Sequence, residues 1–480
     1  MQNVIAKLVI KVNKKDSLVK KFDVVVIGGG PGGYVAAIRA SQLGKKTALI
    51  EASKLGGVCL NKGCIPTKAV LKSAHSVHEL KDFKDLGIDV ELKGVNGTQA
   101  VKRAKGISDR ISKGVGFLMK KNKITVIDGY AKFQTAKTLE VKSPKGHSEI
   151  VEAQNVIIAT GAHYRTFPGL EHDNDRLIGA WEAIHMEEMP KSIGIIGAGA
   201  IGVEFAYFWN AFGVDVHIFE LQKHLLPIED VDSSKEIEKA YKKYGIKMSL
   251  GIEGISAKNT GKDVVFTVKE KGGEKEYKFE KGLIAVGMTG NINGIGLESI
   301  GVKTDRGFVS VNDHYETSVP GVYAIGDVSG APLLAHAASH EGVVAAEHIA
   351  GLKPHPIDKM NIPGCTYCQP QVASVGYTEQ KLKEKGIEYK VGKLPFVANG
   401  KAVASNEKEG FVKTLLGKHG ELLGAHIVGT HATELIHEYV LFRTMEGVDE
   451  EIYNTVHPHP TLGEFLAEAV MAADNRSLNF

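Results

Sequence analysis

Residues 22–30, FDVVVIGGG, predict a short buried strand that runs directly into a glycine turn. A helical stretch over residues 34–43 follows the glycines, and residues 46–51, KTALIE, predict a second strand. The same arrangement returns in residues 192–220, SIGIIGAGAIGVEFAYFWNAFGVDVHIFE. Two β-α-β units in one chain indicate an α/β fold with at least two domains.

Each β-α-β unit carries the pattern G-x-G-x-x-G between its first strand and its helix. Such glycines allow a tight turn and let backbone N–H groups approach a pyrophosphate at the positive end of the helix. An acidic residue ends each second strand, at the spacing expected for an acid that binds a ribose hydroxyl. Two dinucleotide-binding, Rossmann-like domains are therefore predicted. Their binding residues are Gly28, Gly30, Gly33 and Glu51 in the first domain and Gly197, Gly199, Gly202 and Glu220 in the second.

The acid of the second unit also discriminates between coenzymes. A carboxylate at Glu220 can bind the 2′-hydroxyl of NAD and would repel the 2′-phosphate of NADP. No Arg follows within the next few residues, so NAD is favoured over NADP. The alternative is that Glu220 is simply a solvated strand end.

The remaining chain completes the domain organisation. Residues 124–133 and 155–162 predict further strands of the first domain, and residues 319–330 predict another strand followed by a glycine turn. From about Asn361 the pattern indicates an α+β domain with antiparallel strands. The predicted parts are an N-terminal extension (1–21), a first dinucleotide domain (22–165), a second (166–290), a central domain (291–360) and a C-terminal domain (361–480).

Composition excludes several classes of protein. The 480 residues contain 59 Lys and Arg against 56 Asp and Glu, without the basic surplus of nucleic-acid or membrane-surface binders. Four cysteines exclude a secreted disulfide scaffold. We find no apolar run long enough for a transmembrane helix and no secretory signal in the Lys-rich first 20 residues. The expected location is cytoplasmic, or the mitochondrial matrix in a eukaryote, with no nucleic-acid or membrane partner.

Two cysteines, Cys59 and Cys64, follow the first β-α-β unit within GGVCLNKGCIPTK. Five residues of ideal helix rise about 7.5 Å, which exceeds the normal reach of a disulfide. If these cysteines pair, the helix start must be distorted. The alternative is two unrelated buried thiols, but beside two dinucleotide sites we favour a redox-active disulfide.

Two further motifs carry chemistry that the sequence leaves open. In His457-Pro-His459-Pro-Thr-Leu-Gly-Glu464, a carboxylate can orient an imidazole for acid–base work, although a His in such a turn is more often structural. Cys365-Thr-Tyr-Cys368 has the spacing of a redox or zinc motif. No second ligand pair lies downstream, so we expect two partly buried thiols and no metal site.

Four stretches in combination with the two glycine fingerprints resemble one family. They are GGVCLNKGCIPTK (56–68), YAIGDV (323–328), LAHAASHEG (334–342) and HPHPTLGE (457–464). The chain is similar to the flavoprotein pyridine-nucleotide disulfide oxidoreductases over residues 22–470. The resemblance implies two dinucleotide domains and a C-terminal dimerisation domain, with FAD and NAD as cofactors.

The resemblance also implies roles for individual residues. FAD would be held by the first fingerprint together with Ala131, Thr160, Gly161, Asp327, Leu334, Ala335 and His336. NAD would be held by the second fingerprint and Gly287. Lys68 would lie beside the flavin and pair with Glu204.

The implied reaction oxidises protein-bound dihydrolipoamide with reduction of NAD. Substrate thiolate would attack Cys59, and Cys64 would then face the flavin as a thiolate. His459, oriented by Glu464, would take the substrate proton and would belong to the partner subunit. A homodimer follows, with the lipoyl domains of 2-oxo acid dehydrogenase or glycine cleavage complexes as partners.

Some positions depart from the family pattern, and other functions compete. Ala162, Tyr164 and the segment Gly287-Met-Thr-Gly-Asn291 differ from the usual residues at the nicotinamide end. A glutathione-reductase-like enzyme would prefer Ala at Gly202 and basic residues for NADP, and this sequence has neither. A non-catalytic scaffold of a multienzyme complex should have lost at least one of the reactive side chains. All four of them are present, namely Cys59, Cys64, His459 and Glu464.

Overall fold

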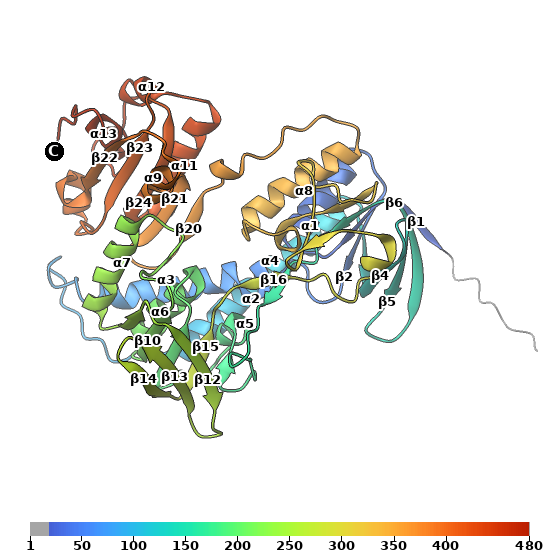
Figure 1. Ribbon diagram of the computed structural model, residues 1–480, viewed down its shortest axis with the longest axis horizontal. Helices are drawn as coiled ribbons and strands as arrows, with labels where there is room; N and C mark the ends of the chain where they lie inside the picture. Colours follow the sequence, from blue (N-terminus) through green and yellow to red (C-terminus); the bar gives the residue numbers. More distant parts are fainter. Residues whose placement is uncertain (1–18, 480) are drawn as a thin grey trace, which may run out of the picture. The chain divides into compact units, whose positions relative to one another are not determined.

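The computed structural model describes residues 19–479 (Figure 1). These residues form two compact units, each assembled from three stretches of the chain. The first unit contains the residues up to 57, 114–162 and 290–356, and the second contains 58–113, 163–289 and those from 357 onward. The predicted N-terminal extension lies outside the described residues except at its end, where the first strand already begins at Lys20.

A seven-stranded sheet forms the centre of the first unit, in the order β3-β2-β1-β6-β5-β4 with β19 beside β6. Strands β1, β2, β3, β6 and β19 run parallel, whereas β4, β5 and β6 form an antiparallel meander. Val24, Val25 and Val26 are fully buried, as expected for a parallel strand covered on both faces. The bounds are β1 (Lys20–Ile27), β2 (Thr47–Glu51), β3 (Thr125–Asp128), β4 (Tyr130–Thr135), β5 (Thr138–Lys142), β6 (Ser148–Ile158) and β19 (Val322–Ala324).

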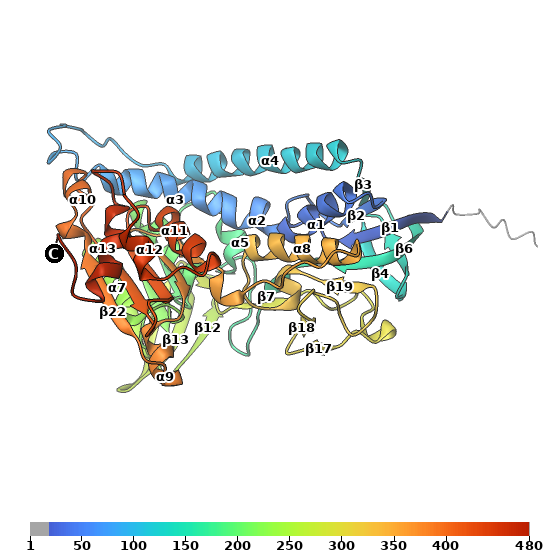
Figure 2. The ribbon, with the colours of Figure 1, turned by 90° about the horizontal axis from the view of Figure 1, so that it is seen from above.

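Two helices of the first unit, α1 (Pro31–Gln42) and α8 (Ala335–Ile349), lie side by side (Figures 1 and 2). Glycines permit their close approach. A Cβ on Gly32 would lie 2.9 Å from the carbonyl oxygen of Ala338, and one on Gly342 would lie 2.6 Å from that of Gly32. Because early α1 meets early α8, the helices run in the same direction and their N-termini lie at the same edge of the sheet.

The second unit contains a five-stranded parallel sheet in the order β11-β10-β9-β15-β8. Helix α6 is apolar nearly all round, and Trp209 within it is fully buried. The bounds are β8 (Leu177–Ile178), α5 (Ala180–Ala183), β9 (Ser192–Ile196), α6 (Ala200–Ala211), β10 (Asp215–Glu220), α7 (Val231–Tyr244), β11 (Lys247–Leu250) and β15 (Lys281–Ile284). An antiparallel sheet precedes β15 in the chain, with β12 (Gly254–Asn259), β13 (Val264–Glu270) and β14 (Gly273–Phe279).

The C-terminal part of the second unit is an antiparallel sheet in the order β20-β21-β24-β23-β22. Its strands are β20 (Gly364–Thr366), β21 (Gln371–Gly376), β22 (Lys390–Pro395), β23 (Phe411–Leu416) and β24 (Leu422–Gly429). Its helices are α9 (Glu379–Lys385), α10 (Gly400–Ala404), α11 (Ala432–Thr444), α12 (Asp449–Tyr453) and α13 (Glu464–Ala472). The predicted α/β class with a C-terminal α+β domain is confirmed.

The remaining elements include the helices around the paired cysteines. They are α2 (Gly57–Lys62), α3 (Cys64–Glu79), α4 (Gly97–Lys121), β7 (Ala162–Tyr164), β16 (Met288–Gly290), β17 (Thr304–Asp305), β18 (Phe308–Val309) and the 3₁₀ turns η1 (Glu298–Ile300), η2 (Gly326–Ser329), η3 (Lys359–Asn361) and η4 (Phe396–Ala398). Over residues 19–479, no helix has both the length and the apolar character that crossing a membrane requires. The predicted domain limits at 165, 290 and 360 stay predictions.

Candidate active site

The first glycine turn joins β1 to α1 and tolerates no side chain at two of its three glycines. Gly28 has φ +107°, and a Cβ there would lie 2.2 Å from the carbonyl oxygen of Ala159. A Cβ on Gly33 would lie 1.9 Å from the carbonyl oxygen of Gly28. Gly30 caps α1 without a side-chain hydrogen bond, and a Cβ on it would meet nothing closer than 3.9 Å. This open helix N-terminus fits a pyrophosphate.

Glu51 closes the turn from the end of β2. Its carboxylate accepts hydrogen bonds from the backbone N–H of Gly29 at 2.6 Å and of Ser53 at 2.7 Å. The Glu51 carbonyl accepts from Gly129, at the start of the meander that carries Ala131. Glu51 and Ala131, both predicted to bind FAD, are therefore neighbours at one edge of the sheet, as binding of one nucleotide requires.

A second turn of the first unit follows β6. The side-chain hydroxyl of Thr160 donates to the carbonyl of Asn291 at 2.9 Å, and the Asn291 amide donates to the carbonyl of Thr160 at 2.8 Å. The Asn291 backbone N–H donates to the carbonyl of Gly161, which has φ +72°. Asn291 thus fixes the turn that contains two of the predicted FAD residues.

Asp327 lies in the 3₁₀ turn after β19, and buried Glu341 of α8 holds that turn. The Glu341 carboxylate accepts the N–H of Gly326 at 2.5 Å. Burial raises the pKa of Asp327. Leu334, Ala335 and His336 form the start of α8 at the same edge. The carboxyl ends of β1, β6 and β19 and two helix N-termini therefore converge, and these residues fit a bound dinucleotide such as FAD.

The turn between β9 and α6 repeats this construction in the second unit. Gly197 has φ +101°, and a Cβ on Gly202 would lie 2.0 Å from the carbonyl oxygen of Gly197. Gly199 caps α6 and faces open space. Glu220 accepts the N–H groups of Ala198 at 2.7 Å and Gln222 at 2.9 Å, as Glu51 does in the first unit.

Gly287 adjoins this second turn. A Cβ on Gly197 would lie 2.4 Å from the carbonyl oxygen of Ala285, so the segment that leads to Gly287 passes directly beside the fingerprint. Gly287 has φ +108°, faces open space and accepts the N–H of Arg165 through its carbonyl at 3.0 Å. The residues of the second unit fit NAD at the end of β9 and β10.

Tyr164, which departs from the family pattern, packs in an aromatic cluster with His172 and Trp181. The Tyr164 ring lies 4.8 Å from that of His172 and 4.6 Å from that of Trp181, measured between centroids. Its hydroxyl accepts the backbone N–H of Trp181, and burial raises its pKa. His172 in turn contacts the carbonyl of Ile284 at the end of β15. Tyr164 therefore braces the strand that leads to Gly287.

Cys59 and Cys64 form a disulfide, with their Cα atoms 4.6 Å apart. The helix is broken between them, because α2 ends at Lys62, Gly63 takes non-helical angles and α3 begins at Cys64. The expected distortion is thus observed. It brings together two Cα atoms that a continuous helix would hold beyond disulfide reach.

Lys68 lies one helical turn after Cys64 on α3 and pairs with Glu204 of α6. The Lys68 Nζ is 3.1 Å from each carboxylate oxygen of Glu204. The Glu204 side chain is 6% exposed and that of Lys68 35% exposed. The buried Glu204 therefore holds the partly exposed ammonium group of Lys68, which is four residues from Cys64 on the same helix.

His459 and Glu464 form the predicted dyad. Nδ1 of His459 lies 2.8 Å from a carboxylate oxygen of Glu464, and the His459 side chain is 80% exposed. No hydrogen bond or ion pair of the described residues joins His459 to Cys59 or Cys64. The structure brings together the two members of each predicted pair: cysteine with cysteine, lysine with glutamate, and histidine with glutamate.

Cys365 and Cys368 are free thiols. Burial raises the pKa of the Cys365 thiol to about 11, and it also raises that of fully buried Cys368. Neither thiol has the depressed pKa of a reactive cysteine. Within residues 19–479, no cluster of three or more His, Cys, Asp or Glu side chains is arranged to hold a metal ion.

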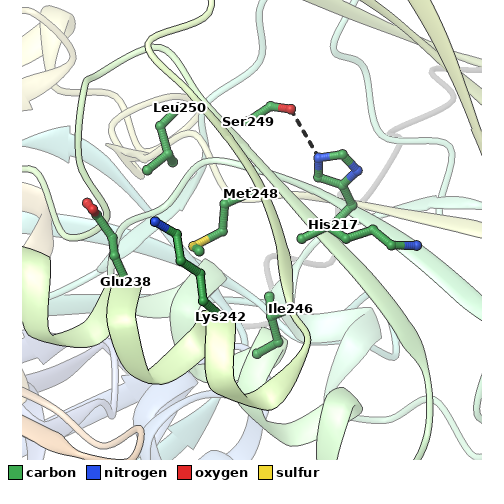
Figure 3. Close-up of a pocket in the computed structure, with 8 residues that line it drawn as sticks. His217, Glu238, Lys242, Ile246, Met248, Ser249 and Leu250 are labelled. Carbon is green, nitrogen blue, oxygen red and sulfur yellow. Dashed lines mark hydrogen bonds between the residues drawn. The ribbon is translucent and has the colours of Figure 1, made fainter.

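A surface hollow of about 500 Å³ lies between α7 and the strands β10 and β11 (Figure 3). His217 lies at its margin and bonds to the hydroxyl of Ser249 at 3.1 Å. Burial lowers the pKa of His217 to about 4. None of the predicted site residues lines this hollow.

A chain with two dinucleotide-binding turns and a cysteine pair at a helix break is a nucleotide-dependent disulfide oxidoreductase by its architecture. The family model for pyridine nucleotide-disulphide oxidoreductases matches residues 22–342, and the model for the dimerisation domain of that family matches residues 362–470. The chain belongs to the pyridine nucleotide-disulphide oxidoreductase family. The second match supports a homodimer.

Several curated relatives match the chain over nearly its whole length. A dihydrolipoyl dehydrogenase of Rhizobium etli is 45% identical over 96% of this chain and 100% of its own length. One of Bacillus subtilis is 42% identical over 96% and 99%, respectively. Among solved structures, LpdA of Mycobacterium tuberculosis has a TM-score of 0.87 and 26% identity, covering 94% of this chain and 99% of its own.

Sequence reasoning missed Tyr367, Glu341 and Glu438. In the sequence Tyr367 is only an interior residue of the C-x-x-C motif, but its backbone N–H donates to Glu204 at 2.9 Å. Glu438 accepts from His457, two residues before His459, at 2.8 Å. Glu341 lies inside α8, 15 residues after the Gly326 whose N–H it accepts, and no local sequence signal identifies this contact.

Proposed function

We propose that this protein is an NAD-dependent dihydrolipoyl dehydrogenase that oxidises protein-bound dihydrolipoamide to lipoamide. The observation that carries the proposal is the Cys59–Cys64 disulfide in a chain with two dinucleotide turns. Full-length relatives named dihydrolipoyl dehydrogenase support it. The acid at Glu220 favours NAD over NADP as the electron acceptor.

The cysteine pair performs the first half of the reaction. One thiolate of dihydrolipoamide attacks the Cys59 sulfur, a mixed disulfide forms and Cys64 leaves as a thiolate. The second substrate thiolate then attacks the substrate sulfur of that mixed disulfide. The disulfide of lipoamide forms, the bond between the substrate sulfur and Cys59 breaks, and lipoamide leaves. The cysteine pair is then reduced by two electrons in total.

His459 handles the proton of this exchange. A thiol is a poor nucleophile, so a base must deprotonate the substrate. The Nε2 of His459 accepts that proton while the Glu464 carboxylate, bonded to Nδ1, fixes the ring orientation and stabilises the charge. Desolvation raises the pKa of Glu464, but the hydrogen bonds from Thr461 and His459 together outweigh it and lower the pKa. The Glu464 carboxylate therefore stays ionised.

FAD, when bound, supplies the two-electron chemistry that connects the reduced cysteines to NAD. The turns around Gly28, Gly161 and Asp327 bind it. Lys68, held by Glu204, would place a positive charge beside the flavin.

The site is completed by a second copy of the chain and by a lipoyl carrier. The exposed His459–Glu464 pair of one protomer serves the disulfide of its partner. Leu441, Met445 and Val456, which are 59%, 73% and 94% exposed, provide apolar surface in the C-terminal domain for this dimer. Lipoyl domains of 2-oxo acid dehydrogenase or glycine cleavage complexes deliver the substrate. We infer a cytoplasmic location, or the mitochondrial matrix in a eukaryote.

A side-by-side assay tests the function. The purified protein should be yellow and should reduce NAD with dihydrolipoamide, while it should oxidise NADPH with glutathione disulfide at least about a hundredfold more slowly, because Glu220 repels the 2′-phosphate. The reverse preference would identify a glutathione-reductase-like enzyme. A colourless protein inactive in both assays would favour a non-catalytic scaffold.

A further inference from the structure

Tyr367 contacts both members of the Lys68–Glu204 ion pair. The Lys68 Nζ lies 4.4 Å from the centroid of the Tyr367 ring. The Tyr367 backbone N–H donates to Oε1 of Glu204 at 2.9 Å, and the same oxygen is 3.1 Å from the Lys68 Nζ. One residue of the C-terminal domain therefore closes a three-membered arrangement of ammonium, carboxylate and aromatic ring.

The two partners need different kinds of support. Glu204 is on a buried helix with little freedom, and an N–H donor at one oxygen satisfies part of its hydrogen-bonding capacity. Lys68 carries its charge on a flexible four-carbon chain that remains 35% exposed. The negative face of an aromatic ring attracts an ammonium group and restricts where it can lie.

The C-x-x-C motif holds Tyr367 in this position. Cys368 is fully buried, and its thiol donates to the carbonyl of Pro370 at 3.2 Å. Thr366, on the other side, is also buried in β20. Because both neighbours are packed, the backbone of Tyr367 has a fixed place relative to α6. This gives the cysteine motif a structural role without redox or zinc chemistry.

We propose that Tyr367 is a positioning residue: its ring fixes the Lys68 ammonium and its backbone N–H fixes Glu204. The inference rests on the proposed function only for the statement that Lys68 acts beside the flavin. The geometry assigns the ring to the lysine and the backbone to the glutamate, so side-chain substitutions change only the ring contact directly.

The test compares three variants of the full-length, flavin-loaded protein. Tyr367→Phe keeps the aromatic face and is the control. Tyr367→Met fills a similar volume without that face, and Tyr367→Leu is a second non-aromatic replacement if the Met variant does not fold. The first readout is the rate at which acetic anhydride labels Lys68 relative to exposed Lys145, followed by peptide mass spectrometry.

Loss of a cation–π contact worth about 0.5–2 kcal/mol corresponds to labelling of Lys68 that is roughly two- to thirtyfold faster in the Met or Leu variant. The Phe variant should stay within twofold of the parent protein. A non-aromatic variant that is folded and labelled at the parental rate would overturn the proposal. So would a Phe variant labelled as fast as the Met variant, because the aromatic face would then be irrelevant.

The second readout separates positioning from substrate binding and from general packing. With dihydrolipoamide and NAD, the Met variant should lose kcat by a similar factor, while KM changes less than twofold and Phe restores the parental values. A parent protein that fails to oxidise dihydrolipoamide would contradict the proposed function. The labelling comparison would still decide the role of Tyr367, because it requires no turnover.

Discussion

Nδ1 of His459 lies 2.8 Å from Oε1 of Glu464, and Oε2 of the same carboxylate accepts the backbone N–H of Thr461 at 2.8 Å. Glu464 is the first residue of α13, so the helix start fixes the carboxylate and the carboxylate fixes the imidazole. The other ring nitrogen, Nε2, is left to accept a proton. The His459 side chain is 80% exposed, so the imidazole is accessible to a substrate.

His459→Gln should lower kcat for dihydrolipoamide oxidation by about 10²–10⁴-fold, the usual contribution of a positioned acid–base group. Steady-state assays with purified variants measure this loss. His457→Gln is the matched control, since His457 is two residues away but is bonded to Glu438. It should stay within about threefold of the parent. Equal losses in both variants would mean that the HPHP turn acts only structurally.

Cys64→Ser should abolish the long-wavelength thiolate–flavin absorption of the two-electron-reduced enzyme. The proposed roles place the Cys64 thiolate against the flavin, whereas Cys59 exchanges with substrate. Cys59→Ser is therefore the control. It keeps the Cys64 thiolate but has no disulfide to reduce, so it should show the band with oxidised flavin and without any reductant. The parent protein is reduced anaerobically by two electrons with dithionite, and its visible spectrum is compared with the spectra of both variants recorded without dithionite. A band that survives in Cys64→Ser and disappears in Cys59→Ser would exchange the two assignments.

Glu220→Gln should raise KM for NAD by about ten- to hundredfold, because a hydrogen bond to a charged group contributes roughly 1.5–3 kcal/mol. Glu220→Arg should in addition raise kcat/KM with NADP, since it replaces a repelling charge with an attracting one. KM for dihydrolipoamide is the internal control and should change less than twofold. Unchanged coenzyme kinetics in both variants would make Glu220 an ordinary solvated strand end.

The two glycine turns were predictable because their backbone conformation leaves no room for a side chain. Gly28 and Gly197 stand at turns where a side chain would collide with a neighbouring carbonyl oxygen, and that constraint is visible as glycine in the sequence. The strand predicted over residues 124–133 is in fact two strands, β3 and β4, separated by Gly129 at φ +157°. A glycine inside a strand pattern is a known signal for such a break.

Contacts distant in sequence were not predictable from residue patterns. Tyr367 meets Glu204 across 163 positions, and Lys413 meets Asp230 across 183. Lys413 in particular lies within a strand that is apolar apart from Lys413 and Thr414, and nothing local indicates that Lys413 is fully buried. Such a charge is tolerated only where its partners come from other elements, and these are set by the tertiary fold.

Lys413→Met should destabilise the protein by about 3–5 kcal/mol, because it leaves buried Asp230 without its counter-charge. The Lys413 Nζ lies 2.9 Å from Asp230, 3.0 Å from Asp232 and 2.6 Å from Glu379. Lys393→Met is the matched control. Its ammonium pairs with Asp232 but is 41% exposed, so its loss should cost less than about 1 kcal/mol.

The same cluster should make stability depend on acid. Partial burial raises the pKa of Asp232 and of Glu379, but hydrogen bonds from lysines outweigh it and lower both pKa values to about 2. Because unfolded carboxyls titrate near ~4, this stabilisation is complete above about pH 5 and is lost as the pH falls toward 2. Calorimetry at pH 7 should show a melting temperature roughly 5–10 °C lower for Lys413→Met than for the parent. The gap should narrow by pH 3, and a gap that is constant with pH would show that the carboxylates of this cluster are not the source of the stability.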